Sequence, residues 1–202
     1  MTLKCTTTSF HIGSRKRLPI LSRSAWPTPS PQSRLEQRKR DREAWATLHP
    51  RPWTQETELE YHQRFSTTLE RWLDQGHGSC ILQEPEIGSI VAGALQFFAD
   101  IRFIQHAFII MPNHVHALVT PIGGHALEDI LHSWKSFSAN KINNEARRAG
   151  ELWQRTYFDR IIRDAEHFKN CVRYIRKNPQ KARLQPGRCI HFESAWVAGL
   201  GI

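Results

Sequence analysis

Residues 102–120 read RFIQHAFIIMPNHVHALVT, and this stretch predicts the centre of the fold. Two strands, from about Arg102 to Ile110 and from His114 to Thr120, flank a turn at 111–113. Apolar runs of this length bounded by turn residues are typical of a strand pair. Side chains at positions i and i+2 of a strand point to the same face, roughly 7 Å apart. The imidazoles of His114 and His116 are therefore expected side by side, where they could share a divalent metal ion.

Helices are predicted on both sides of this hairpin in the sequence. Apolar spacing of three and four residues marks one helix entered through Pro85, one at about 127–148, and one at about 165–177 that Pro179 should stop. A short strand is expected near 156–162. We expect an α+β fold with a ferredoxin-like antiparallel sheet and helices packed on one face of it.

The first 32 residues differ in composition from the rest of the chain. They are rich in Ser, Thr, Pro and Arg, and we expect 1–32 to be extended, disordered or degenerate. A single domain is predicted for 33–185, with extra N-terminal helices at 33–48 and 54–74, and a C-terminal tail at 186–202. In this reading the ferredoxin-like unit lacks its first strand.

The formal charge of +9 is unevenly distributed along the chain. Residues 1–53 carry 11 Lys and Arg against 3 Asp and Glu, and residues 125–202 carry 14 against 8. The segment between them is acidic, with 3 against 8. Basic blocks of this kind favour a polyanion such as nucleic acid, because binding releases counterions from phosphates. A solubilising surface is the alternative interpretation.

The four cysteines are too far apart in the sequence for a zinc knuckle or a redox pair. The sequence contains neither a signal-peptide core nor an apolar run of about 20 residues that could span a membrane. We therefore expect a cytoplasmic protein with reduced thiols and no membrane partner.

A metal needs more protein ligands than the histidine pair supplies, and the last helix offers candidates. Tyr174 and Asn178 lie one turn apart at the flank of its apolar stripe. With a divalent ion, Mg²⁺ or Mn²⁺, bound at the phosphate, the phenol of Tyr174 could attack a phosphodiester and remain joined to DNA. The alternatives are satisfied core histidines, a tyrosine at a helix–sheet seam and an asparagine that ends a helix.

Several motifs resemble the single-tyrosine HUH transposases, insertion-sequence-200-like proteins, and in particular their REP-associated branch. They are MPNHVHALV at 111–119, HSWKSFSAN at 132–140, LWQR at 152–155, IRD at 162–164 and YIRKNP at 174–179. The resemblance covers about 55–185. It implies a ferredoxin-like fold, His114 and His116 as metal ligands, Asn178 as a third ligand and Tyr174 as the nucleophile. It further implies a 5′-phosphotyrosine intermediate on single-stranded, hairpin-forming palindromic DNA, bound by a monomer or a homodimer.

Phosphate contacts are predicted from the basic C-terminal half of the chain. Trp134, Trp153 and Tyr157 could stack on unpaired bases, although Trp134 also fits a core position. The candidate phosphate-binding residues are Lys135, Lys141, Arg155, Arg160, Arg163, Arg173, Arg176 and Lys177.

Two other functions compete with a strand-transferring enzyme. A decayed or domesticated relative could bind hairpin DNA without cutting it, because the apolar first strand typical of the family is replaced by residues 12–17 and a Pro/Ser run. A histidine-triad nucleotide hydrolase also uses closely spaced histidines, but Leu118 stands where its third histidine would be.

Overall fold

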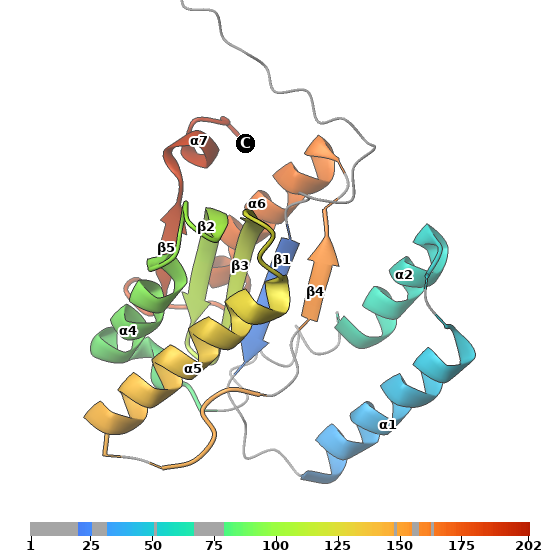
Figure 1. The fold of residues 1–202 in the computed structure, drawn as a ribbon, viewed down its shortest axis with the longest axis horizontal. Coiled ribbons are helices and arrows are strands. Elements are labelled where there is room, and N and C mark those ends of the chain that lie inside the picture. Colours follow the sequence, from blue (N-terminus) through green and yellow to red (C-terminus); the bar gives the residue numbers. More distant parts are fainter. Residues whose placement is uncertain are drawn as a thin grey trace, which may run out of the picture.

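The computed structural model describes residues 20–25, 32–50, 52–66, 79–147, 149–154, 158–162 and 164–202. In these residues a five-stranded antiparallel sheet has the order β4-β1-β3-β2-β5 (Figure 1). The strands are β1 (Ile20–Ala25), β2 (Phe103–Met111), β3 (His114–Pro121), β4 (Phe158–Ile161) and β5 (Ile190–Glu193).

The predicted hairpin is the centre of this sheet. β2 pairs with β3 from Met111 opposite His114 to Phe103 opposite Pro121, with a register shift between Gln105 and Ala107. The turn between the strands is held from outside, because the amide of Leu82 donates to the carbonyl of Pro112 over 3.0 Å. The two histidines thus begin a strand whose neighbours are β1 and β2.

The order of elements confirms the predicted α+β, ferredoxin-like fold. Helix α4 (Pro85–Gln96) lies between β1 and β2 in the chain, and α5 (Leu127–Glu145) lies between β3 and β4. The strands β4-β1-β3-β2 with these two helices make up the β-α-β-β-α-β unit of ferredoxin-like proteins. β5 extends the sheet beyond β2.

The first strand, which the composition of residues 1–32 led us not to expect, is present. β1 lies between β3 and β4, with Ile20 opposite Val119 and Ala25 opposite His114. Its sequence, ILSRSA, mixes short polar and apolar residues and is followed closely by prolines, so it lacks the alternation that marks a strand. Backbone bonds to two neighbouring strands form it instead. With β5 at 190–193, the sheet includes residues on both sides of the predicted 33–185 domain.

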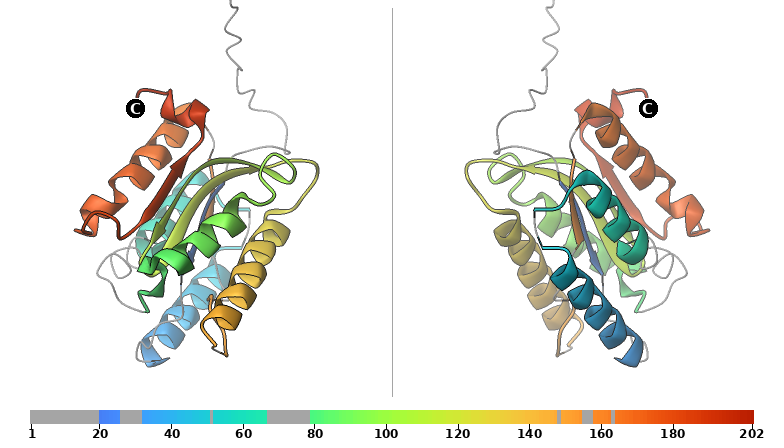
Figure 2. Two further views of the ribbon diagram at one scale, coloured as in Figure 1. Left: turned by 90° about the vertical axis from the view of Figure 1, so that its left-hand side faces the viewer. Right: turned by 90° about the vertical axis from the view of Figure 1, so that its right-hand side faces the viewer.

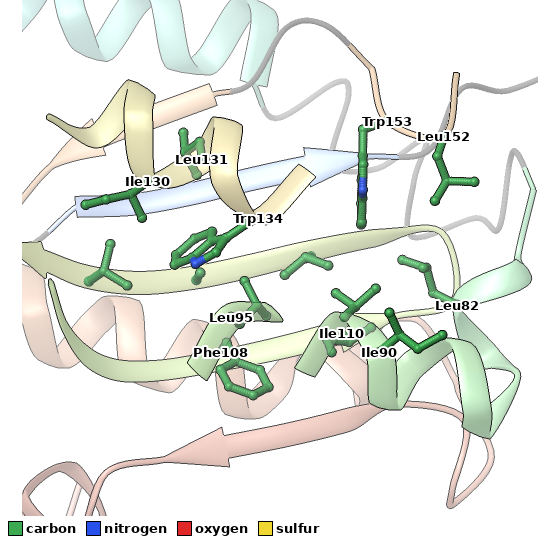
Figure 3. Packing of buried hydrophobic residues seen from close by; sticks show 14 of the residues in the cluster. Leu82, Ile90, Leu95, Phe108, Ile110, Ile130, Leu131, Trp134, Leu152 and Trp153 are labelled. Carbon is green, nitrogen blue, oxygen red and sulfur yellow. The ribbon is translucent and has the colours of Figure 1, made fainter. Parts of the chain in front are cut away.

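One face of the sheet is covered by α4 and α5, as their apolar spacing predicts. Leu95 of α4 and Trp134 of α5 belong to the same buried cluster as Phe108 and Ile110 of β2 (Figure 3). The indole of Trp134 meets the ring of Phe103 edge to face, with centroids 5.1 Å apart. This face is therefore a buried apolar core.

The expectation that helices cover only one face is corrected by the structure. Helix α6 (Ala165–Lys181) and the short α7 (Ala195–Ala198) lie on the other face, opposite α4 and α5 (Figure 2). The physical reason is the continuous apolar run of β2, because alternate residues of a strand point to opposite faces. Ile109 and Met111 would be exposed without α6, and they pack with its residue Ile175.

The prediction that Pro179 stops α6 is wrong. Asp164 caps the start of the helix, because its carboxylate accepts a hydrogen bond from the amide of His167 over 2.7 Å. The helix continues through Pro179 to Lys181. A proline removes one amide donor, but the next turn resumes, with the amide of Ala182 donating to the carbonyl of Asn178 over 3.0 Å. Asn178 is therefore an internal helix residue.

The extra helices predicted near the N-terminus are also present. Helix α1 (Gln32–Leu48) and helix α2 (Gln55–Tyr61), which continues as the π-helix η1 (His62–Ser66), lie at the β4 side of the sheet (Figure 1). Trp45 lies 3% exposed between these helices, within 5.3 Å of the rings of Trp53 and Tyr61. The second helix was predicted to extend to residue 74, and its predicted residues 67–74 lie outside the described residues. Among the described helices, none combines the length and apolar character needed to cross a membrane.

Candidate functional site

β3 presents the predicted histidine pair on the face of the sheet that α6 covers. His114 and His116 are each 1% exposed, and their rings stand at 89° with centroids 4.7 Å apart. The two Nε2 atoms are 3.0 Å apart. Both histidines therefore direct the same nitrogen to one point, as the i and i+2 positions of a strand allow.

The orientation of His114 is set by the residue that precedes it. The Nδ1 atom of His114 lies 2.7 Å from the amide oxygen of Asn113, which is itself 2% exposed. An amide oxygen only accepts hydrogen bonds, so Nδ1 of His114 carries the proton and donates it. In the neutral ring Nε2 is then the nitrogen with the lone pair, which is the state that a metal ligand requires.

α6 brings Tyr174 against this pair. The tyrosine ring meets the ring of His116 edge to face, with centroids 5.1 Å apart and planes at 89°. Its hydroxyl oxygen is buried, and the ammonium of Lys181 lies 4.4 Å from the ring centroid. The predicted nucleophile and the predicted ligands therefore meet within one chain.

Asn178 lies one turn beyond Tyr174, among the buried residues of α6. It is 0% exposed, and neither its amide oxygen nor its amide nitrogen has a hydrogen-bond partner among the described residues. Leaving a buried polar group unsatisfied costs about 1–3 kcal/mol. Such a group in a native protein needs an explanation, and a bound ion or ligand is one of them.

These residues fit a divalent metal ion. In an octahedral shell with bonds of about 2.1 Å, two adjacent ligand atoms are about 3.0 Å apart, and the Nε2 atoms have this separation. No group of three or more His, Cys, Asp and Glu residues suited to a metal occurs in the described chain. The predicted third ligand is the amide oxygen of Asn178, which is buried and has no hydrogen-bond partner among the described residues. Two imidazoles and an amide oxygen suit Mn²⁺, and Mg²⁺ when water and phosphate complete its shell.

Several of the predicted phosphate-binding residues bond within the protein. The ammonium of Lys135 donates to the carbonyl of Gln154 over 2.9 Å, and burial lowers its pKa. Arg173 forms an exposed ion pair with Glu166 on the same helix, with nitrogen and oxygen 2.9 Å apart. Lys135 is therefore poorly placed to contact DNA, whereas Arg173 lies at the surface.

Arg176 is also engaged, because Glu193 of β5 binds its guanidinium through two bonds of 2.8 Å. Lys177 is exposed, and Lys141 is exposed with its ammonium 4.0 Å from Glu145. Lys141 and Lys177 are thus the predicted contacts whose ammonium groups face solvent.

The remaining predicted DNA contacts are not described in full. Arg155, Arg163 and Tyr157 lie outside the described residues. Arg160 lies on β4 opposite Leu21, with its side chain outside the description.

The two tryptophans considered for base stacking belong to the core. Trp134 is 7% and Trp153 is 8% exposed. The indole nitrogen of Trp153 donates to the hydroxyl of Ser138 over 2.8 Å (Figure 3 shows both indoles inside the cluster). The core interpretation of Trp134 is therefore the correct one, because its helical stripe packs on the sheet. Leu118, at the place of a third histidine, is 0% exposed on the α6 face.

Three residues of the site were not predicted. Asn113 directly precedes the histidine pair, and Lys181 follows Tyr174 by seven residues, a spacing that returns to the same side of a helix. Both could have been found from spacing. Glu193 is 17 residues beyond Arg176 on a strand that the sequence did not predict, so no local signal pointed to it.

The elements that carry the site match a known family. Residues 93–178 match the family model described as IS200-like transposases, which confirms the resemblance over β2, β3, α5 and α6 as far as Asn178. One similar solved structure is a REP-associated tyrosine transposase bound to a REP hairpin, with 12% identity over 86% of this chain and 73% of that chain, and a TM-score of 0.45. Another is a candidate transposase from Deinococcus radiodurans R1, with 14% identity over 84% and 96%, and a TM-score of 0.38. A search among curated proteins found no match.

Proposed function

We propose that this protein is a metal-dependent transposase that cuts and rejoins single-stranded DNA. Its substrate would be a hairpin-forming, REP-type palindrome, and Tyr174 would carry the cut strand as a 5′-phosphotyrosine. The family matched by residues 93–178 supports a transposase, an enzyme that cuts and rejoins DNA. The assignment of the nucleophile, the metal and the hairpin substrate depends on the residues of the site.

One observation carries the proposal. The ring of Tyr174 contacts His116, whose Nε2 lies 3.0 Å from that of His114. Asn178 is buried one turn away from Tyr174, with no hydrogen-bond partner among the described residues. A phenol, two imidazoles and an amide are poor choices for an apolar core. Together they support the proposal of a nucleophile that lies beside a metal site.

The chemistry follows from what these groups can do. A divalent ion held by His114, His116 and Asn178 would draw charge from the oxygens of the scissile phosphate. The phenol oxygen of Tyr174 then bonds to phosphorus and loses its proton, while the bond from phosphorus to the 3′ oxygen breaks and that oxygen leaves as a hydroxyl. In the reverse direction a 3′ hydroxyl attacks the phosphotyrosine, so strands are rejoined without ATP.

The test uses a labelled single-stranded hairpin oligonucleotide with Mn²⁺ or Mg²⁺. Wild type should form a covalent protein–DNA adduct and a free 3′ end, and Tyr174→Phe should form neither while its DNA affinity stays the same. Chelation with EDTA should abolish both products. Equal cleavage by wild type and Tyr174→Phe would show that the nucleophile is wrong.

Hairpin binding without catalysis is the second candidate. The apparent loss of the first strand was its main support, and β1 is present between β3 and β4. A salt-sensitive complex with hairpin DNA that never yields an adduct would favour it over the enzyme. Sedimentation of that complex would also distinguish a monomer from a homodimer.

A further inference from the structure

The helix that carries Tyr174 is fastened to the C-terminal segment of the chain by one arginine. The Nε and Nη2 atoms of Arg176 donate to the two carboxylate oxygens of Glu193, each over 2.8 Å. The guanidinium also donates to the carbonyl of Val197 over 3.4 Å and to the carbonyl of Ile202. Bidentate pairs of this kind are stronger and more directional than single charge contacts.

The acceptors of Arg176 are themselves fixed to the sheet. Glu193 pairs with Ala107 in the ladder between β5 and β2, and the amide of Ser194 donates to the carbonyl of His106 over 2.9 Å. Val197 is 0% exposed in the cluster under α6. The Glu193 side chain is 9% exposed, and the hydrogen bonds from Arg176 lower its pKa. The contact therefore joins α6 to β5 of the sheet and to the buried Val197 of α7.

Arg176 and Tyr174 leave α6 on opposite flanks. A step of two residues along a helix, as from Tyr174 to Arg176, turns about 200° around its axis. A step of four residues, as from Tyr174 to Asn178, ends only about 40° past a full turn. Tyr174 and Asn178 thus share one flank, and Arg176 lies on the other, with the buried Ile175 between the flanks. On the flank away from Tyr174, the guanidinium of Arg176 is bound to Glu193 and Val197, and it can set the rotation of the helix on the sheet.

We propose that Arg176 and Glu193 are a positioning pair, which holds α6 in the rotation and height that place the Tyr174 ring against His116. This inference rests on the proposed function for its effect on catalysis, because a displacement of about 1 Å at a reacting group can lower a rate by about 100-fold. It replaces the prediction that Arg176 contacts DNA phosphates.

The two roles of Arg176 make different predictions for DNA binding. Loss of a phosphate contact weakens hairpin binding and lowers the salt dependence of log Kd by about one ion. Loss of a positioning contact lowers the rate of adduct formation at saturating DNA and leaves Kd and its salt dependence unchanged. Glu193→Gln separates the roles most sharply, because it removes no positive charge from the protein.

The experiment compares Arg176→Met, Glu193→Gln and the double variant with Arg188→Met, a control that removes an exposed charge from the loop before β5. Single-turnover adduct formation on the hairpin should fall about 10- to 100-fold in both pair variants. The double variant should be no slower than the singles, because the two residues act as one unit. Arg188→Met should match wild type. Rates unchanged in Glu193→Gln, or hairpin binding weakened only in Arg176→Met, would overturn the proposal.

A second readout does not depend on catalysis. The chain has three tyrosines, so ¹⁹F NMR of fluorotyrosine-labelled protein resolves Tyr174, assigned with Tyr174→Phe. Both pair variants should shift or broaden this resonance, while Arg188→Met leaves it unchanged. If wild type forms no adduct, the proposed function fails, but this spectrum still decides the positioning role. An unmoved Tyr174 signal in both folded pair variants would refute it.

Discussion

The two faces of the sheet are built from different kinds of contact. On the face under α4 and α5, Phe108, Ile110 and Trp134 form an apolar cluster. On the face under α6, His114, His116 and Asn178 are as deeply buried as that core, yet they are polar. The second face has an apolar cluster of its own around Ile109 and Ile175, but it also buries polar groups beside Tyr174. We conclude that apolar packing holds helices on both faces, and that the α6 face gives up some stability to bury polar groups for the site.

The largest effect on stability is expected from truncating a side chain in the apolar cluster under α4 and α5. Trp134→Ala removes a buried indole that packs on Phe103, and should lower the free energy of unfolding by about 3–5 kcal/mol. Urea unfolding followed by circular dichroism measures this change. Hairpin cleavage per folded molecule should stay near the wild-type rate, because Trp134 lies on the face away from the histidines. A stability loss below about 1 kcal/mol would mean that the two faces do not differ as described.

A smaller effect should appear on the second face as the pH falls. The imidazole of His106 lies 2.8 Å from the hydroxyl of Thr120 and beside Phe168, and burial lowers its pKa to about 4. The neutral form is favoured in the folded state, so its stabilising contribution is complete above the unfolded pKa of about 6.5 and is lost as the pH falls toward 4. The loss should approach about 3 kcal/mol.

The measurement is the difference in unfolding free energy between wild type and His106→Gln from pH 7 to pH 4. The glutamine is neutral throughout, so this difference isolates His106 from the other titrating groups. It should shrink steadily across that range. A difference that does not change with pH would show that His106 titrates normally in the folded protein.

The smallest effect, and one of opposite sign, is expected at Asn178. Replacing an unsatisfied buried amide with an apolar group of similar shape removes a desolvation cost, so Asn178→Leu should raise the free energy of unfolding by about 1 kcal/mol. Hairpin cleavage should fall at the same time. Asn178→Asp is the matched control, because it keeps an oxygen ligand and should cleave better than the leucine variant with Mn²⁺. A clear loss of stability in Asn178→Leu would mean that the amide is satisfied within the fold.

The parts of the fold that were predicted correctly are those with local signals. The hairpin at 102–120, the three-four spacing of α5 and the entry of α4 at Pro85 all appear within a few residues of the expected bounds. β1 and β5 have no such signal, because backbone pairing with neighbours distant in the chain forms them. The helices on the second face are needed because β2 is apolar on both of its sides. A sheet with only one face covered would leave one of those sides in water.

The sequence by itself determined the chemistry that the site can contain. His114 and His116 must share a face of a strand, and Tyr174 and Asn178 must share a flank of a helix, because both spacings follow from the geometry of the backbone. Only the tertiary structure decided that these two surfaces meet, with the Tyr174 ring on His116, and that the guanidinium of Arg176 is bound by Glu193 of β5. Those contacts join residues 17 to about 60 positions apart, and the packing of α6 on the sheet, rather than any local preference, brings them together.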